Sequence, residues 1–180
     1  EANYFMAGSA PQEPVRSIRN SRYGYTNHTD VNVSYASLET YLADIAELVE
    51  TGKLSEEKEF YAPVRLRGGQ KVADLATAGI RYIELRNIDI NPFEMYGISQ
   101  DQVKFLHLFL LYLATKEEGA DADAWVEEGN RKNNQVALEH PLNQTIYLEE
   151  AKVVAEELIA FAKEISCLLY TSPSPRDTER

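Results

Sequence analysis

The chain has 180 residues, of which 44% are hydrophobic and 26% are charged, so it is neither a disordered segment nor a membrane span. Its formal net charge of -11 argues against nucleic acid or an anionic membrane as a partner, because such surfaces are approached with Lys and Arg. The single cysteine, Cys167, excludes an intrachain disulfide framework and a cysteine-based zinc site, which favours a reducing, cytoplasmic location.

The first elements of the chain are an irregular segment and a helix. The sequence begins at Glu1 with neither a basic start nor an apolar run, so we expect no signal peptide and a start inside a longer protein. Residues 1–16 contain prolines among small and polar residues and are expected to be irregular. From Ser37 to Val49, apolar residues recur at helical spacing, with Ser37 as the N-cap and Gly52 past the end. This pattern predicts an amphipathic helix.

Two segments rich in aromatic and β-branched residues follow, Phe60 to Arg67 and Ile80 to Ile90, and both are predicted to be strands. Gly68 and Gly69 are expected to form a turn between them, and the stretch from Val72 to Ala78 a short helix. On the second strand the apolar side switches after Arg86, which indicates a bulge or a strand end near the next residue.

Polar residues on the second strand carry the most informative chemistry. Tyr82, Glu84 and Arg86 share one face, because side chains alternate along a strand. A carboxylate can hold a hard Mg²⁺ ion, and a guanidinium can clamp phosphoryl oxygens. An ion pair on a solvated sheet face is the more common arrangement, and the residues alone leave both open. Arg65 and Arg67 of the first strand could likewise help with phosphate or mark a solvated edge.

The second half of the chain is predicted to be helical. Ser99 and Gln102 form a capping box before an apolar run that reaches Leu113, and this run is too short to span a bilayer. We therefore expect a buried core helix there, with His107 as a core histidine. Residues 117–124 are acidic and small and are predicted to be a loop. Further helices are predicted from Trp125 to Leu138 and from Leu148 to Ile165.

The last residues differ from the rest. Ser166 to Arg180 break the helical pattern and resemble a translated sequencing-adaptor string. We interpret residues 166–180 as a non-native tail and residues 1–165 as the protein proper.

Three stretches together resemble bacterial glutamate-cysteine ligases in order and spacing. They are RNSRYGYTN at 19–27, FYAPVR at 60–65 and YIELRNIDINPF at 82–93, and the resemblance runs from about Pro14 to Ile165. The helix around FLHLFLL at 105–111 is most similar to the ligase part of the fused, two-activity glutathione synthetases of bacteria.

The resemblance implies an α+β fold: a glutamine-synthetase-like antiparallel sheet cup with outer helices, incomplete in this chain. Residues 1–165 would be the C-terminal part of the catalytic domain. The implied reaction uses ATP and Mg²⁺ to phosphorylate the γ-carboxylate of glutamate, and the amine of cysteine then attacks the acyl phosphate. The implied partners are these small-molecule substrates, with no nucleic acid and no membrane.

The resemblance also implies roles for five residues. By position, Glu84 matches a Mg²⁺ ligand, and Arg86 matches the arginine that contacts ATP and the transferred phosphate. Arg19, Tyr25 and Tyr61 match residues around the incoming cysteine. Without the resemblance, surface charge for Arg19 and strand packing for the tyrosines would be preferred.

The family takes further metal-binding carboxylates from an N-terminal half that the sequence does not contain. We therefore expect the 180-residue chain itself to be inactive. Two alternatives stay open: a module of the same fold that binds without turnover, and a carboxylate-amine ligase with another amine as acceptor.

Overall fold

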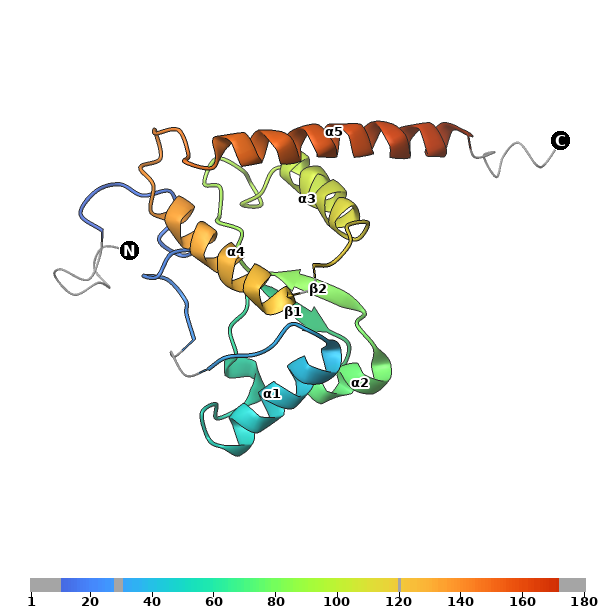
Figure 1. The fold of residues 1–180 in the computed structure, drawn as a ribbon. Coiled ribbons are helices and arrows are strands. Elements are labelled where there is room, and N and C mark those ends of the chain that lie inside the picture. The colour runs from blue at the N-terminus through green and yellow to red at the C-terminus, as the bar shows by residue number, and fades with distance from the viewer. Residues whose placement is uncertain (1–10, 28–30, 120, 172–180) are drawn as a thin grey trace. The chain divides into compact units, whose positions relative to one another are not determined.

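The computed structural model in Figure 1 describes residues 11–27, 31–119 and 121–171. The chain divides into two compact units, one formed by Glu1–Asp89 with Glu118–Asn143 and the other by Ile90–Glu117 with Gln144–Arg180. The fold is α+β. Its α-helices and strands in the described residues are α1 (Leu38–Glu50), β1 (Val64–Arg67), α2 (Leu75–Ala78), β2 (Tyr82–Leu85), α3 (Gln100–Leu113), α4 (Ala122–Ala137) and α5 (Leu148–Thr171), with short 3₁₀ turns at Glu57–Glu59 and Val72–Asp74.

Helix α1 confirms the helix predicted from Ser37 to Val49. The Ser37 hydroxyl accepts the main-chain N–H of Thr40 at 3.1 Å, and the Thr40 hydroxyl accepts the N–H of Ser37 at 3.1 Å. This reciprocal cap satisfies donors that the first turn leaves unpaired. The helix ends at Glu50, and Gly52 adopts a positive φ of 74°, as the sequence predicts for the residue past the end.

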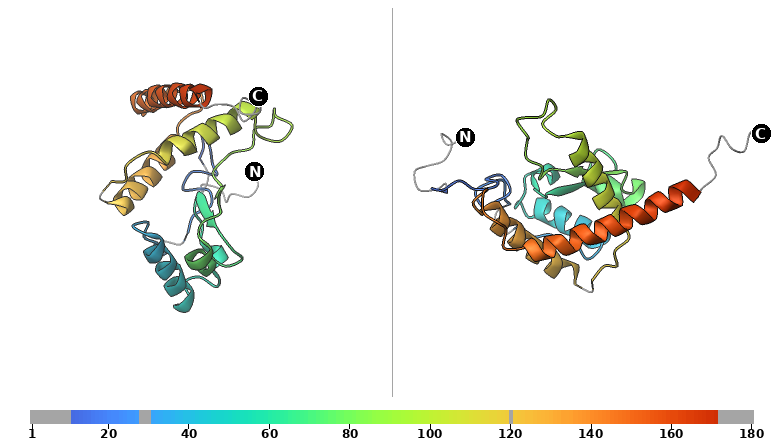
Figure 2. Two further views of the ribbon diagram at one scale, coloured as in Figure 1. Left: turned by 90° about the vertical axis from the view of Figure 1, so that its right-hand side faces the viewer. Right: turned by 90° about the horizontal axis from the view of Figure 1, so that it is seen from above.

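The core of the first unit lies on one face of α1. Tyr41, Ile45 and Leu48 are buried, at the spacing that places side chains on one side of a helix. They pack with buried residues of the neighbouring segments, namely Val31, Leu54, Phe60 and Ala62. The rings of Tyr41 and Phe60 meet edge to face, with centroids 6.2 Å apart. Helix α2 lies beside α1 in the views of Figures 1 and 2.

Strands β1 and β2 form an antiparallel pair in which Arg65 lies opposite Glu84 and Arg67 opposite Tyr82. Gly68 follows β1 where a Cβ would lie 2.1 Å from the carbonyl oxygen of Gly79, so the connection through α2 needs glycine there. Both strands are shorter than predicted. Beyond β2 the carbonyl groups of Arg86 and Asn87 accept hydrogen bonds from side chains instead of from a neighbouring strand. The predicted strand end near Asn87 is therefore confirmed, and the continuation to Ile90 is wrong.

Helix α4 belongs to the first unit and begins before the predicted Trp125. Asp121 caps it by accepting the main-chain N–H of Ala124 at 3.0 Å. Residues 122–124, predicted to end a loop, are therefore the first turn of the helix, because the cap satisfies donors of that turn.

In the second unit, α3 has the predicted capping box of Ser99 and Gln102 but is not a buried core helix. Of its residues only Tyr112 is buried, Phe105 is 54% exposed and His107 is exposed. A helix that is apolar on all sides buries only the side that has a neighbour, and α3 packs on α5. Tyr112 and Phe161 meet there with ring centroids 5.8 Å apart.

Helix α5 continues to Thr171, so the helical pattern does not stop at Ile165 as expected. Residues 172–180 lie outside the described residues, and the interpretation of residues 166–180 as a non-native tail stays a prediction. Across the described ranges, no helix is long and apolar enough to cross a bilayer.

Candidate functional site

The polar face of the sheet carries Glu84 in contact with arginines. Arg67 grips one carboxylate oxygen of Glu84 from the neighbouring strand, with Nε at 3.0 Å and Nη2 at 2.8 Å. Nε of Arg86 lies 3.9 Å from the other oxygen. The antiparallel register creates this arrangement, because it places alternate residues of β1 and β2 on the same face.

Positively charged side chains outnumber negatively charged ones on this face of the sheet. The hydrogen bond from Arg67 is the main cause that holds the pKa of Glu84 below its usual value, helped by the positive charges of Arg67, Arg86 and Arg65. Burial, followed by repulsion from Arg67 and Arg86, lowers the pKa of Arg65. One carboxylate therefore faces three guanidinium groups on a protein whose formal net charge is -11. Such a patch is suited to an anion such as a phosphoryl or carboxylate group.

The same contacts decide whether Mg²⁺ fits these residues. Mg²⁺ requires six oxygen ligands in near-octahedral geometry. Within the described residues there is no group of three or more His, Cys, Asp or Glu side chains that could hold a metal ion. Glu84 is already paired with Arg67. The residues described here therefore do not form a Mg²⁺ site by themselves.

The segment before α1 is fastened to the end of β2 through its side chains. Arg19 donates from Nη2 to the carbonyl oxygen of Arg86, and Nδ2 of Asn20 donates to that of Asn87 at 3.0 Å. The Nε of Arg19 is buried and has no hydrogen-bond partner among the described residues. A buried donor without a partner is costly, so this Nε is a polar group that the described residues leave unsatisfied.

Tyr25 and Tyr61 complete a chain of contacts. Their ring centroids lie 6.0 Å apart, and the guanidinium carbon of Arg86 lies 5.3 Å from the centre of the Tyr61 ring. The structure thus brings together all five residues that the resemblance singled out, because Arg19 and Glu84 both contact Arg86. Tyr25 remains 71% exposed, so much of this residue is accessible from solvent.

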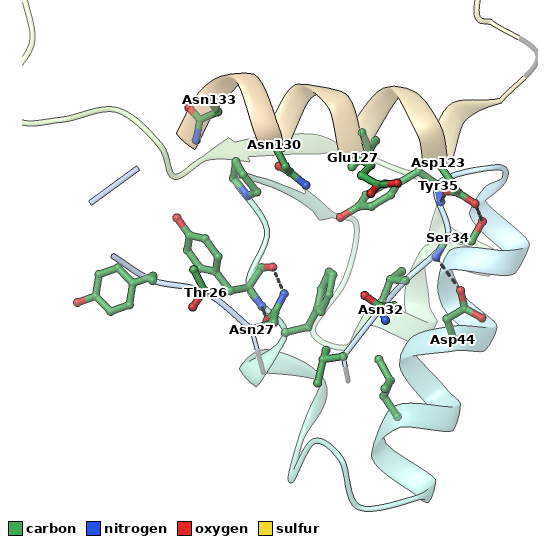
Figure 3. A pocket seen from close by; sticks show the side chains of 18 of the residues that line it. Thr26, Asn27, Asn32, Ser34, Tyr35, Asp44, Asp123, Glu127, Asn130 and Asn133 are labelled. Atoms are coloured by element: carbon green, nitrogen blue, oxygen red, sulfur yellow. Dashed lines mark hydrogen bonds between the residues drawn. The ribbon is translucent and has the colours of Figure 1, made fainter. Parts of the chain in front are cut away.

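A hollow of about 950 Å³ opens beside these residues in the first unit. Arg19, Tyr25 and Tyr61 line it, whereas Glu84 and Arg86 do not. Figure 3 shows part of its wall, to which α1 contributes Asp44, α4 contributes Glu127 and Asn130, and the segment before α1 contributes Asn32. The predicted acceptor residues therefore share a hollow, and the predicted phosphate and metal residues lie on the adjoining sheet face.

Sequence reasoning missed several residues of this wall. The polar residues of α4 are ordinary for a solvated helix face, and nothing in their spacing distinguishes Asn130 or Glu127. Asn27 lies inside one of the three family-like stretches, but the resemblance gives it no role. Only the grip of Arg67 on Glu84 had a signal, because strand alternation places Arg67 and Arg65 on one face.

Two aspartates hold the hollow's rim in place. The main-chain N–H of Ser34 donates to Asp44 of α1 at 2.7 Å. The Ser34 hydroxyl and the N–H of Tyr35 donate to Asp123 of α4 at 2.7 Å and 2.6 Å. The bond from Tyr35 and then that from Ser34 lower the pKa of Asp123. The segment is thereby tied to two helices that frame the hollow.

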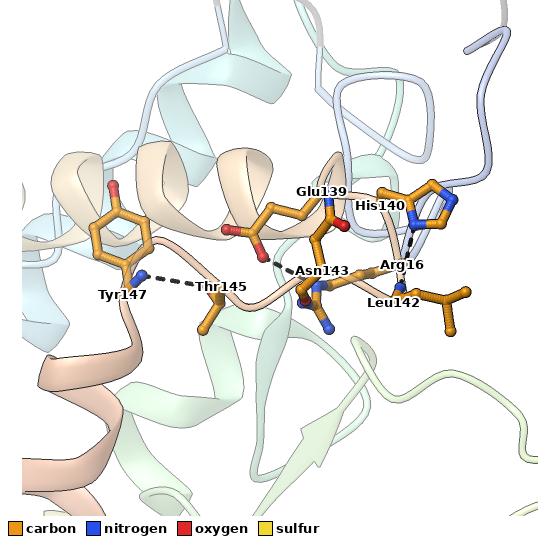
Figure 4. A network of polar contacts seen from close by, with 7 residues as sticks. All are labelled: Arg16, Glu139, His140, Leu142, Asn143, Thr145 and Tyr147. Atoms are coloured by element: carbon orange, nitrogen blue, oxygen red, sulfur yellow. Dashed lines mark hydrogen bonds and ion pairs between the residues drawn. The ribbon is translucent and has the colours of Figure 1, made fainter.

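The start of the described chain is tied to the end of α4 (Figure 4). Nε of Arg16 bonds the Glu139 carboxylate at 3.0 Å, and Nη2 of Arg16 donates to the carbonyl oxygen of Asn143. The main-chain N–H of Arg16 donates to the carbonyl oxygen of Glu139 at 3.0 Å. Because Arg19 follows three residues later, these bonds help to fix the segment that carries it.

We expect Arg16→Ala to destabilise the first unit by about 1–2 kcal/mol, because it removes charge-assisted bonds to partly buried acceptors. The Arg16 and Glu139 side chains are only 31% and 13% exposed. Lys152→Ala is the matched control, since its ion pair with Glu149 is 55% and 82% exposed and should contribute little. Urea unfolding of both variants measures the difference, and equal midpoints would contradict the role given to Arg16.

Comparison with known proteins adds to this geometry. The family model for glutamate-cysteine ligase matches residues 50–136. The glutathione biosynthesis bifunctional protein of Enterococcus faecalis is 58% identical over 160 residues, which are 88% of this chain and 21% of that protein. The bifunctional protein of the same name from Pasteurella multocida is 45% identical over 167 residues, which are 92% of this chain and 22% of that protein.

A solved structure gives the same result. The crystal structure of a bifunctional glutathione synthetase from Pasteurella multocida matches with a TM-score of 0.83 and 42% identity, over 98% of this chain and 23% of that chain. The chain thus spans about a fifth of the length of the relatives that it matches. The family match and these identities show that the chain belongs to the glutamate-cysteine ligase family.

Proposed function

We propose that this chain is part of an enzyme that uses ATP to join L-cysteine to the γ-carboxyl group of L-glutamate through a γ-glutamyl phosphate, the first step of glutathione biosynthesis. The observation that carries the proposal is the contact chain from Glu84 through Arg86 to Arg19, Tyr61 and Tyr25. The family match and the names of the relatives, which are glutathione biosynthesis proteins, support it.

The residues divide into two tasks. Arg86, with Arg65 and Arg67 near it, offers positive charge where phosphoryl oxygens gain negative charge during transfer. Arg19 lines the hollow and offers its guanidinium charge to the carboxylate of the incoming cysteine, and the tyrosines orient it. When the amine is already positioned, less translational and rotational entropy is lost in reaching the transition state for its attack on the acyl phosphate.

Metal binding would need more than the residues that the structure describes. ATP and Mg²⁺ are the cofactors expected for the whole enzyme, and Mg²⁺ would supply charge neutralisation along the phosphoryl group. In the structure the Glu84 carboxylate pairs with the guanidinium groups of Arg67 and Arg86 instead, and these contacts hold the two groups in place. Its proposed role as a Mg²⁺ ligand requires further carboxylates from outside the described residues.

The proposal also covers the sheet architecture of the whole enzyme and its location in the cell. The antiparallel pair β1 and β2, with its polar face, is suited to form part of a glutamine-synthetase-like sheet cup in the whole enzyme. A cytoplasmic location accords with the acidic composition and with the small, polar substrates proposed. Glutamate and cysteine would be the partners of the site.

Transplantation tests the proposal. Residues of this chain would replace the matching 160 residues of the Enterococcus faecalis protein, to which they are 58% identical. We expect this chimera to form γ-glutamylcysteine with ATP, and the purified 180-residue chain to form none, because its described residues hold no metal group. Both proteins are purified from a host that lacks its own ligase, and the γ-glutamylcysteine that they form is measured by mass spectrometry. A folded chimera without product would overturn the proposal, and product from the isolated chain would overturn its dependence on other residues.

A further inference from the structure

Asn27 connects two segments of the first unit that are distant in the sequence. Its Nδ2 donates to the carbonyl oxygen of Tyr61 at 2.7 Å, and the main-chain N–H of Tyr61 donates to its Oδ1 at 2.8 Å. Both bonds are drawn in Figure 3. A side-chain amide has one acceptor and one donor group side by side, so it can satisfy both polar groups of a single residue's main chain, as a neighbouring strand would.

Tyr61 depends on this pair of bonds for its main-chain position. It precedes β1, which begins at Val64, and so it receives no support from the strand pair. The two bonds to Asn27 are the ones that the described structure provides for its N–H and its carbonyl group. The side chain of Asn27 therefore fixes the main-chain position from which the Tyr61 side chain extends.

The Tyr61 ring in turn lies between the two halves of the site. Its centroid is 6.0 Å from that of Tyr25 and 5.3 Å from the guanidinium carbon of Arg86, so the ring contacts both residues. Tyr25 and Asn27 are two residues apart, so the segment that supplies one ring also anchors the other. A shift of the Tyr61 main chain would change both contacts together.

We propose that Asn27 is a positioning residue of the acceptor side of the site: it holds Tyr61 between Tyr25 and Arg86 through paired bonds to the Tyr61 main chain. The expected effect of Asn27 on catalysis rests on the proposed function, whereas its effect on the position of Tyr61 does not. Asp cannot replace Asn27, because a carboxylate has no N–H for the carbonyl group of Tyr61 and would repel it. Ala would leave both main-chain groups without their partner.

The geometry is tested in the 180-residue chain by NMR, through nuclear Overhauser effects between the Tyr25 and Tyr61 rings. We expect these cross-peaks in the wild type and their loss in both Asn27→Asp and Asn27→Ala. Asn91→Ala is the matched control, because Asn91 also accepts a main-chain N–H, that of Phe93 at 3.1 Å, in a turn of the second unit. It should keep the cross-peaks. If Asn27→Ala fails to fold, the isosteric Asn27→Asp decides, and cross-peaks retained in Asn27→Asp would overturn the positioning role.

The catalytic consequence is tested in the chimera by steady-state kinetics. Asn27→Asp should raise KM for cysteine on the order of tenfold or more, since small misplacements at a site have effects of this size, and leave KM for ATP nearly unchanged. Asn91→Ala should change neither. Lost cross-peaks with an unchanged KM for cysteine would overturn the acceptor role. An inactive wild-type chimera would instead contradict the proposed function, and the NMR result would still decide the positioning of Tyr61.

Discussion

In the chimera, Arg86→Ala should lower kcat by about 10²–10³-fold, while KM for cysteine and for ATP change much less. Arg86 is the residue that touches both halves of the site, through the Glu84 carboxylate at 3.9 Å and the Tyr61 ring at 5.3 Å. A cation aimed at the transferring group acts most strongly when charge develops, so its loss should appear in the chemical step. Steady-state kinetics with each substrate varied in turn measures this.

Two further variants separate charge from geometry. Arg86→Lys keeps the charge but loses the planar fork and the stacking on Tyr61, so an intermediate kcat is expected. Arg81→Ala is the control, because Arg81 is an exposed arginine just before β2, and its activity should equal that of the wild type. An Arg86→Ala enzyme with wild-type kcat at saturating substrate would remove Arg86 from the phosphate role.

Arg19→Ala should act on binding of cysteine instead. If the guanidinium group of Arg19 pairs with the cysteine carboxylate, its removal costs about 2–5 kcal/mol of binding, which is about 30-fold or more in KM for cysteine. KM for ATP should change far less, because Arg19 lines the hollow and not the face that carries Glu84 and Arg86. The Arg81→Ala control serves here as well.

A second consequence of the structure bears on this variant. Arg19 also donates to the main-chain carbonyl group of Arg86, so its loss could loosen the end of β2. Arg19→Lys tests this, since an ammonium group can still pair with a carboxylate as a point charge but cannot serve two acceptors in the arginine geometry. Recovery of the cysteine KM in Arg19→Lys would favour the carboxylate role. An unchanged KM for cysteine in Arg19→Ala would contradict it.

Elements with local signals could be predicted from the sequence. The cap at Ser37 and the glycine at position 52 define α1 within a residue, because both act through neighbours in the chain. The same is true of the box of Ser99 and Gln102 that starts α3. Burial could not be predicted in this way. Whether the apolar faces of α3 are covered depends on which elements lie next to it, and in the described residues α5 packs against it.

The candidate site shows the same division. Strand alternation correctly placed Glu84 and Arg86 on one face, but the partner of Glu84 depends on the register of β1 and β2, which puts Arg67 within 2.8 Å. The roles of Asn20 and Asn27 rest on main-chain groups of residues 87 and 61. Side-chain bonds to distant main chain leave no spacing pattern in a sequence. The resemblance located the residues, and the structure is needed for the contacts.

The choice of acceptor is the most direct test of the proposed site as a whole. The chimera would be given ATP, glutamate and either cysteine, an alkylamine of similar size that lacks a carboxylate, or ammonia, and the amide products would be measured by mass spectrometry. Because the proposed site pairs Arg19 with the carboxylate of cysteine, we expect γ-glutamylcysteine as the main product and at least about tenfold less product from the other amines at equal concentration. Equal product from the alkylamine or from ammonia would contradict the acceptor site built from Arg19, Tyr25 and Tyr61.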